Sequence, residues 1–149
     1  MTAKALSRHL LHVFPSFAVG GSQTRFGQLV AAHEDRYRHT VISLDGRLDM
    51  ETRLAPGSPV VCRSWTGSKG GLWGPAVQSR RKLKQIRPDM LVTYNWGSMD
   101  WWLANRWLPV TSHVHIEDGF GPEEQSIQLG RRVLARRLLL SGPQTTVVV

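Results

Sequence analysis

The sequence predicts an α/β fold class in which helices cover both faces of a mostly parallel sheet. Short apolar segments alternate with longer amphipathic ones along the chain, an order typical of parallel strands joined by helices. Proline and glycine mark most of the boundaries between these segments. Because the chain has 149 residues, of which 41% are hydrophobic, it can bury one core, and we expect a single domain over residues 1–149.

The first strand is expected at residues 10–14, and Gly20 and Gly21 then open a helix. Three residues are predicted on the apolar face of this helix: Phe26, Leu29 and Val30. A strand, a glycine turn and a helix start bring backbone N–H groups close to whatever lies above the sheet. The positive end of the helix favours an anion such as phosphate. The alternative is that the two glycines form a plain turn.

Two more strands are expected at residues 39–44 and 59–62, followed by a helix that begins near Pro75 and ends before Pro88. The buried face of this helix is predicted to contain Ala76, Leu83 and Ile86. Its basic residues are then left in solvent. Residues 90–94 form the clearest buried strand, because the run is continuously apolar and follows a Pro-Asp dipeptide.

Ser98 is the expected N-cap of the next helix, which extends to Trp107. Its core residues are predicted to be Met99, Trp101, Trp102, Leu103 and Trp107. The remaining elements are expected as a strand at residues 110–116, a loop at 117–121, a helix at 122–142 and a sixth strand at 145–149. Six strands with intervening helices predict a Rossmann-like, doubly wound sheet.

Ligands of such sheets bind beyond the carboxyl ends of the strands. This rule gathers residues that are far apart in the sequence on one edge: Gly20, Gly21, Asn95, Trp96 and the loop at 115–121. Trp96 is expected either to stack on a ligand or to support its own loop. We therefore predict one binding site at this edge.

The formal net charge of +8 is concentrated in two basic clusters, at residues 80–87 and 131–137. Such clusters suit nucleic acid, anionic lipid or phosphorylated substrates, and charge alone does not choose among them. The single Cys62 excludes an internal disulfide and fits a reducing compartment. No apolar run approaches the roughly 20 residues that cross a bilayer. We expect a cytoplasmic protein, with contact between the last helix and anionic lipid at the inner membrane face as a further hypothesis.

Three segments share features with one enzyme family. They are the strand and glycine loop at 12–21, the Pro-Asp-strand segment at 87–95, and the segment at 109–123, in which a strand ends near His115. With these segments the sequence resembles the amino-terminal domain of a retaining glycosyltransferase of the GT-B fold, family 4. The resemblance extends from about residue 9 to residue 149.

The resemblance implies one half of an enzyme that transfers a sugar from a nucleotide sugar to a glycan or lipid-linked acceptor. Gly20 and Gly21 would approach the phosphates of the donor, and His115 would be the catalytic residue beside the transferred sugar. Glu117 and Asp118 would orient sugar hydroxyls or an acceptor. Ser22, Asn95 and Trp96 complete the expected binding residues. No cofactor is expected besides the nucleotide-sugar substrate.

His113 is the alternative to His115. We expect the alternation of the strand to place the two imidazoles on opposite faces, and we favour His115, although the register of a strand end leaves His113 open. A metal site built from both histidines with Glu117 and Asp118 is conceivable, but the expected separation of the histidines argues against it. A structural histidine and two helix-capping carboxylates are the other interpretations of these residues.

The second domain of the family, which holds the nucleotide, has no counterpart in this sequence. Sugar transfer needs positive charge for the leaving diphosphate in a closed, water-poor cleft. We therefore expect the chain to be inactive alone and to need a donor-binding domain in cis or in trans.

Parts of the sequence are compatible with two other function classes. One is a non-catalytic, basic Rossmann-like module that binds nucleic acid or another polyanion, but no recognition motif supports it. The other is a nicotinamide-dependent oxidoreductase. It is weak because the next glycine after Gly21 is Gly27, which does not fit the G-x-G-x-x-G spacing.

Overall fold

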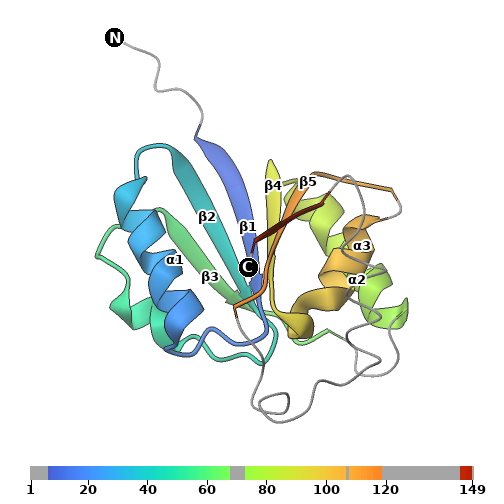
Figure 1. The fold of residues 1–149 in the computed structure, drawn as a ribbon, viewed down its shortest axis with the longest axis horizontal. Helices are drawn as coiled ribbons and strands as arrows, with labels where there is room; N and C mark the ends of the chain where they lie inside the picture. Colours follow the sequence, from blue (N-terminus) through green and yellow to red (C-terminus); the bar gives the residue numbers. More distant parts are fainter. Residues whose placement is uncertain (1–6, 68–72, 107, 119–144, 149) are drawn as a thin grey trace.

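The computed structural model describes residues 7–67, 73–106, 108–118 and 145–148. Within them, six strands form one sheet in which all neighbours are parallel (Figure 1). The strands are β1 (Arg8–Phe14), β2 (Tyr37–Ser43), β3 (Val60–Ser64), β4 (Met90–Tyr94), β5 (Ser112–Ile116) and β6 (Thr145–Val148). Their order across the sheet is β3-β2-β1-β4-β5-β6. This is a Rossmann-like order, and it confirms the predicted fold class.

Helices of the described part cover both faces of the sheet. They are α1 (Gly21–Ala32), α2 (Trp73–Ile86) and α3 (Met99–Arg106), with the 3-10 helices η1 (Asp49–Arg53) and η2 (Trp96–Ser98). In Figure 1, α1 lies on one side of the sheet, and α2 and α3 lie on the other. The sheet is therefore doubly wound, as predicted. None of the described helices is long and apolar enough to span a bilayer.

The core beneath α1 is aromatic. Phe14 of β1 stacks on Tyr94 of β4 with a centroid separation of 3.8 Å, and Phe26 and Val30 of α1 are buried against this sheet face. The prediction that Leu29 shares the buried face is wrong, because its side chain is 50% exposed. Successive residues of a helix are about 100° apart, so a face centred between Phe26 and Val30 leaves Leu29 at its margin.

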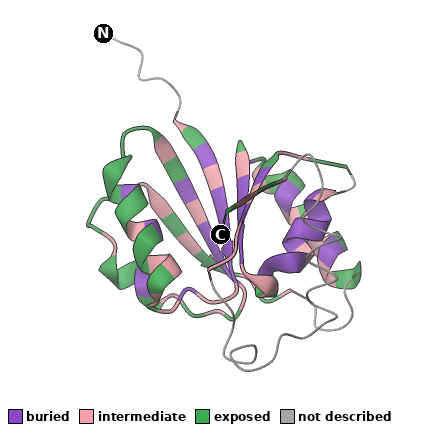
Figure 2. Cartoon of the chain, in the orientation of Figure 1, coloured by how far each residue is buried: buried purple, intermediate pink, exposed green. Residues whose placement is uncertain are grey.

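The core on the other face is formed by alternate residues of β1 and β4 with α2 and α3 (Figure 2). The predicted core residues of α3 that the structure describes are all buried: Met99, Trp101, Trp102 and Leu103. Trp107 lies outside the described residues. On α2, Ala76 and Leu83 are buried as predicted, whereas Ile86 is only partly buried.

Several predicted boundaries differ from the structure by one or two residues. β1 begins at Arg8 rather than at residue 10, and β2 covers Tyr37–Ser43 rather than 39–44. β3 covers Val60–Ser64 rather than 59–62, and α2 begins at Trp73 rather than near Pro75.

α3 begins at Met99, directly after Ser98 as predicted, and the hydroxyl of Ser98 donates to the carbonyl of Tyr94 at 2.7 Å. β5 begins at Ser112 rather than at residue 110, because the side-chain oxygen of Asn105 accepts the N–H of Val110 at 2.8 Å. The predicted loop at 119–121 and helix at 122–142, with the second basic cluster, lie outside the described residues.

Candidate functional site

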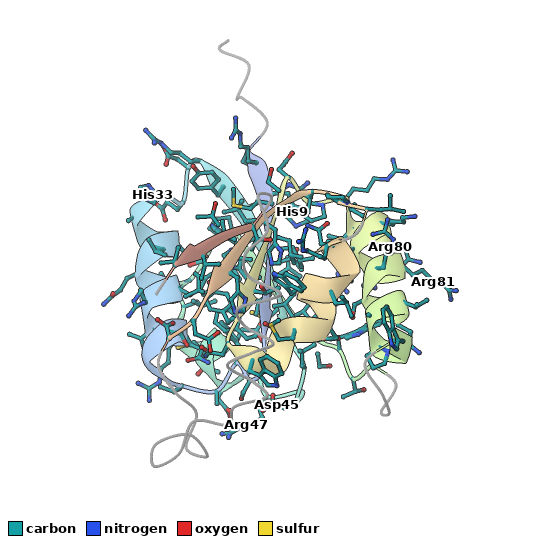
Figure 3. All side chains as sticks on the ribbon, turned by 45° about the vertical axis from the view of Figure 1, so that its right-hand side comes forward. His9, His33, Asp45, Arg47, Arg80 and Arg81 are labelled. Atoms are coloured by element: carbon teal, nitrogen blue, oxygen red, sulfur yellow. The ribbon has the colours of Figure 1, made fainter. Side chains whose placement is uncertain are left out.

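The carboxyl ends of β1 and β4 form the switch point of the sheet. After β1 the chain continues to α1 on one face, and after β4 it continues to η2 and α3 on the other face. This edge is the lower one in Figure 1. In Figure 3, Asp45 and Arg47, which follow β2, mark the same end, and His9 and His33 mark the opposite end. Parallel sheets bind ligands at such a point because the diverging loops leave a crevice between them.

The glycine turn leaves the start of α1 open. Gly20 is the N-cap of α1, with an extended backbone (φ −165°, ψ −179°) and no side-chain cap from the described residues. A Cβ added to Gly21 would meet no described atom within 4 Å. Neither glycine has a positive φ. The side chain of Gln23 lies over Gly20, where an added Cβ would be 2.7 Å from its Oε1, so the open space at the start of α1 is at Gly21. The N–H groups of a helix start favour an anion.

The loops after β1 and β4 touch each other. A Cβ on Gly97 of η2 would lie 2.7 Å from Cβ of Pro15, a contact that real Cβ atoms do not tolerate. The absence of a side chain at Gly97 therefore lets the two loops approach. Trp96, the preceding residue, is partly buried and packs against the α2–α3 cluster that contains Trp102. This packing fits the predicted support of its loop, and stacking on a ligand stays a prediction.

Asn95 has the most unusual backbone at this edge. Its φ of +53° and ψ of 175° fall near a region that is populated almost only by glycine. Its side-chain oxygen accepts the N–H of Asp118 at 2.8 Å, and its own N–H donates to the carbonyl of Ile116 at 2.9 Å. These bonds hold the strained residue in place and join the loops after β4 and β5.

Asp118 joins the same loops to α1. Its Oδ1 accepts a hydrogen bond from Nη1 of Arg25 at 2.7 Å, and Arg25 lies one turn along α1 from Gly21. Its other oxygen, Oδ2, is buried and has no hydrogen-bond partner among the described residues. A carboxylate oxygen that is removed from water without a donor is costly. A hydrogen-bond donor placed at this oxygen would therefore be stabilising.

His113 and His115 lie on the same face of β5, so the prediction that they face opposite ways is wrong. Side chains two residues apart in a strand point in the same direction. The hydroxyl oxygen of Thr93 lies 2.8 Å from Nε2 of His113 and 2.8 Å from Nδ1 of His115. Nε2 of His115 lies 3.0 Å from Oε2 of Glu117. Burial is the main cause that lowers the pKa of His113 to about 3, and the neighbouring His115 adds to it, so His113 is neutral.

His115 has no exposed surface and reaches the edge of the sheet through Glu117. Its catalytic role stays a prediction. The separation of the histidines was the reason for rejecting a metal site, and that reason no longer holds. Even so, the described ranges contain no group of three or more His, Cys, Asp or Glu residues that could hold a metal ion.

Two residues of this site were not predicted from the sequence. Thr93 was predicted only as part of the apolar strand at residues 90–94. In the structure its hydroxyl faces the histidines of β5. Arg25 lies in the middle of a helix among other polar residues, and nothing in its spacing indicates an ion pair with Asp118.

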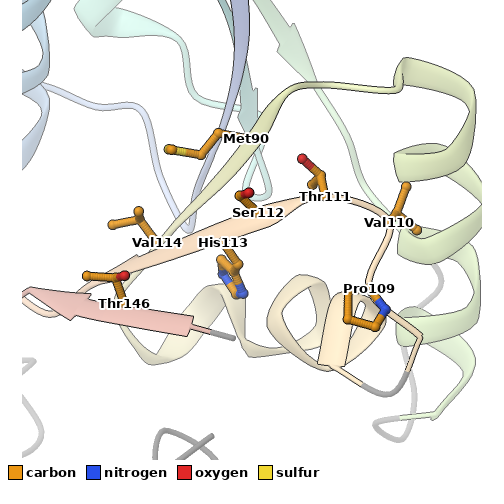
Figure 4. Close-up of a pocket in the computed structure, with 8 residues that line it drawn as sticks. All are labelled: Met90, Pro109, Val110, Thr111, Ser112, His113, Val114 and Thr146. Atoms are coloured by element: carbon orange, nitrogen blue, oxygen red, sulfur yellow. The ribbon is translucent and has the colours of Figure 1, made fainter. Parts of the chain in front are cut away.

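A cavity of about 480 Å³ lies toward the amino ends of β4 and β5 (Figure 4). It is lined by Met90, Pro109, Val110, Thr111, Ser112, His113, Val114 and Thr146. His113 is the residue of its wall that connects to the carboxyl edge, through Thr93.

The basic cluster of α2 is only partly free in solvent. Arg81 is exposed on the outer side of α2 (Figure 3), whereas Arg80 is only partly exposed. Nη1 of Arg80 donates to the carbonyls of Ala104 at 2.8 Å and Leu108 at 2.7 Å, so this guanidinium closes the end of α3. The prediction of a solvated face therefore holds for Arg81 but not for Arg80.

Comparisons with known protein families, with curated proteins and with solved structures found no match to this chain. Fold and site geometry are thus the basis of the functional argument.

Proposed function

We propose that this chain is the acceptor-side half of a glycosyltransferase, which transfers a sugar from a nucleotide sugar to a glycan or lipid-linked acceptor. One observation supports the proposal most strongly. The loops after β1, β4 and β5 meet at the switch point, where Asn95 binds Asp118 and Asp118 binds Arg25. This is where a Rossmann-like sheet binds its ligand.

The groups at this edge suit the two parts of a nucleotide sugar. The open start of α1 at Gly21 offers N–H donors to a phosphate. Glu117 and Asp118 offer carboxylate oxygens, which accept hydrogen bonds from sugar hydroxyls more strongly than neutral acceptors do. His115 acts on the ligand through Glu117.

The proposal includes a second domain that holds the nucleotide and neutralises the leaving diphosphate. It also places the protein in the cytoplasm, at the inner face of the membrane where the acceptor is lipid-linked. The basic residues then contribute to attraction of phosphorylated substrates and of anionic lipid.

Isothermal titration calorimetry of the protein with UDP-glucose and with GDP-mannose tests the proposal. We expect weak, saturable binding to one of them. Glu117→Gln and Asp118→Asn should each weaken it about fivefold, because each change removes a charge-assisted hydrogen bond. Asp49→Asn is the matched control, since Asp49 is exposed in η1 and pairs with Arg47.

Equal binding by all four proteins would contradict the proposal. Binding of single-stranded DNA or heparin, unaffected by Asp118→Asn and lost on Arg81→Ala, would favour the polyanion-binding alternative.

A further inference from the structure

Four side chains form a continuous polar connection through β4 and β5. It runs from His113 through Thr93 and His115 to Glu117, and each of its three links is between 2.8 and 3.0 Å. Thr93 and His115 have no exposed surface, and His113 is 4% exposed. The connection therefore begins at the wall of the cavity in Figure 4 and ends at the carboxyl edge of the sheet.

The donors and acceptors of this connection have one consistent arrangement when His115 is neutral. An ionised Glu117 only accepts hydrogen bonds, so Nε2 of His115 carries the proton and Nδ1 is an acceptor. Thr93 has a single hydroxyl hydrogen, which it then donates to Nδ1 of His115. Its oxygen in turn accepts a hydrogen bond from Nε2–H of His113, which fits the neutral state of that buried ring.

We propose that Thr93 and His113 are positioning residues for Glu117. They hold His115 as the Nε2–H tautomer, and His115 in turn keeps the carboxylate of Glu117 oriented toward a hydroxyl-bearing ligand, such as a sugar, at the edge of the sheet. The role in ligand binding rests on the proposed function above. The tautomer itself does not, and it can be measured without any ligand.

The alternative arrangement is chemically distinct. If Thr93 donated instead to His113, Nδ1 of His115 would have to carry a proton. His115 would then be an imidazolium paired with Glu117, or a neutral Nδ1–H ring facing a protonated Glu117. In either case Thr93 and His113 would not select the Nε2–H tautomer.

Long-range ¹H–¹⁵N correlation spectra of the ¹⁵N-histidine-labelled protein at neutral pH distinguish these arrangements. We expect the wild-type protein to show both His113 and His115 as neutral Nε2–H rings. Thr93→Val should shift the Nδ1 and Nε2 resonances of His115 toward those of mixed tautomers, and Thr93→Ser, which restores the hydroxyl, should return them. An imidazolium or an Nδ1–H ring at His115 in the wild-type protein overturns the proposal, as does an unchanged His115 in Thr93→Val.

The wild-type and Thr93→Ser spectra keep the test decisive if Thr93→Val does not fold. A second readout separates the inference from the proposed function. The Kd for whichever of UDP-glucose and GDP-mannose binds should rise about fivefold in Thr93→Val and stay within twofold in Thr93→Ser. Binding with unchanged affinity in both variants overturns the positioning role alone. An Nε2–H ring at His115 in a protein that binds neither compound overturns the proposed function, and with it the positioning role, while the tautomer stands.

Discussion

At the scale of single residues, the carboxyl edge depends on positions where the side chain is small or the backbone is unusual. Gly97 allows the loops after β1 and β4 to approach, and Asn95 bridges to the loop after β5 from a strained backbone. The sequence indicated that both residues turn the chain after a strand. It could not indicate the positive φ of Asn95, because that conformation is imposed by hydrogen bonds to residues of another strand.

Substitution of Asn95 separates its backbone role from its side-chain role. Asn95→Ala loses the bond to Asp118 and keeps the strain, so we expect it to lower the free energy of unfolding by about 1–3 kcal/mol. Asn95→Gly loses the same bond but tolerates the conformation, so it should be less destabilising by roughly 1 kcal/mol. Urea unfolding measures both, and equal destabilisation would show that the backbone is not strained.

Alanine substitutions at Gly97 and Gly21 are matched tests, because an added Cβ would collide at one position and meet no described atom at the other. A methyl group at Gly97 collides with Pro15, so Gly97→Ala should cost about 1–3 kcal/mol of stability. A methyl group at Gly21 meets no described atom, so Gly21→Ala should change stability by no more than about 0.5 kcal/mol. The same variant should weaken nucleotide-sugar binding, because the methyl group occupies the approach to α1. Thermal unfolding and calorimetry provide the two readouts, and a destabilised Gly21→Ala that still binds normally would refute this account of the glycine.

At the scale of the elements, boundaries set by the local sequence pattern were predictable, and boundaries set by tertiary contacts were not. The strand at residues 90–94 was predicted to the residue and the start of α1 to within one residue, because proline, glycine and apolar runs mark them. The start of β5 was not, because Asn105, in α3, removes Val110 from the sheet. The sequence alone was enough to place His113 and His115 on one face of their strand, because side chains two residues apart point the same way. The prediction that they face opposite ways misapplied this rule.

The face of the sheet under α1 contains a buried histidine pair that should make the fold sensitive to acid. Nε2 of His12 lies 3.0 Å from Nδ1 of His39. Burial lowers the pKa of His39 to about 4 and that of His12 well below its ordinary value. The unfolded chain, with a histidine pKa near 6.5, binds these protons first. Stability is therefore complete above about pH 6.5 and falls as the pH drops toward about 4.

Between about pH 7.5 and pH 5 we expect His39 alone to account for about 2 kcal/mol of lost stability. Urea midpoints across this range measure the loss, and His39→Leu should reduce its slope. The slope should not vanish, because His113 makes a contribution of the same sign. Substitution of the exposed His33 serves as the control. Identical slopes in His39→Leu and the parent protein would contradict the assignment.

At the scale of the whole molecule, the alternation of strands and helices predicted the parallel sheet, its doubly wound form and the gathering of residues at its carboxyl edge. These predictions were possible because the rules for the handedness and connections of parallel strands allow few topologies. The contacts at that edge could not be predicted, since the bond between Arg25 and Asp118 joins residues 93 positions apart.

A single wall of a cleft should not catalyse sugar transfer. We expect no measurable turnover when the purified chain is incubated with a radiolabelled nucleotide sugar and a simple saccharide acceptor, because neutralisation of the leaving diphosphate is assigned to the second domain. Co-expression with a donor-binding domain should produce turnover. Turnover by the chain alone would show that a separate donor-binding domain is not needed, contrary to the proposal.

The most direct test of the central claim is a map of amide chemical shifts in the ¹⁵N-labelled protein during titration with UDP-glucose and GDP-mannose. The account predicts that one of them shifts the amides of Gly21, Asn95 and Asp118 together, with a common Kd, and leaves His33 at the far end of α1 unmoved. Shifts confined to the outer face of α2, or to the cavity near Pro109 and Thr111, would contradict it.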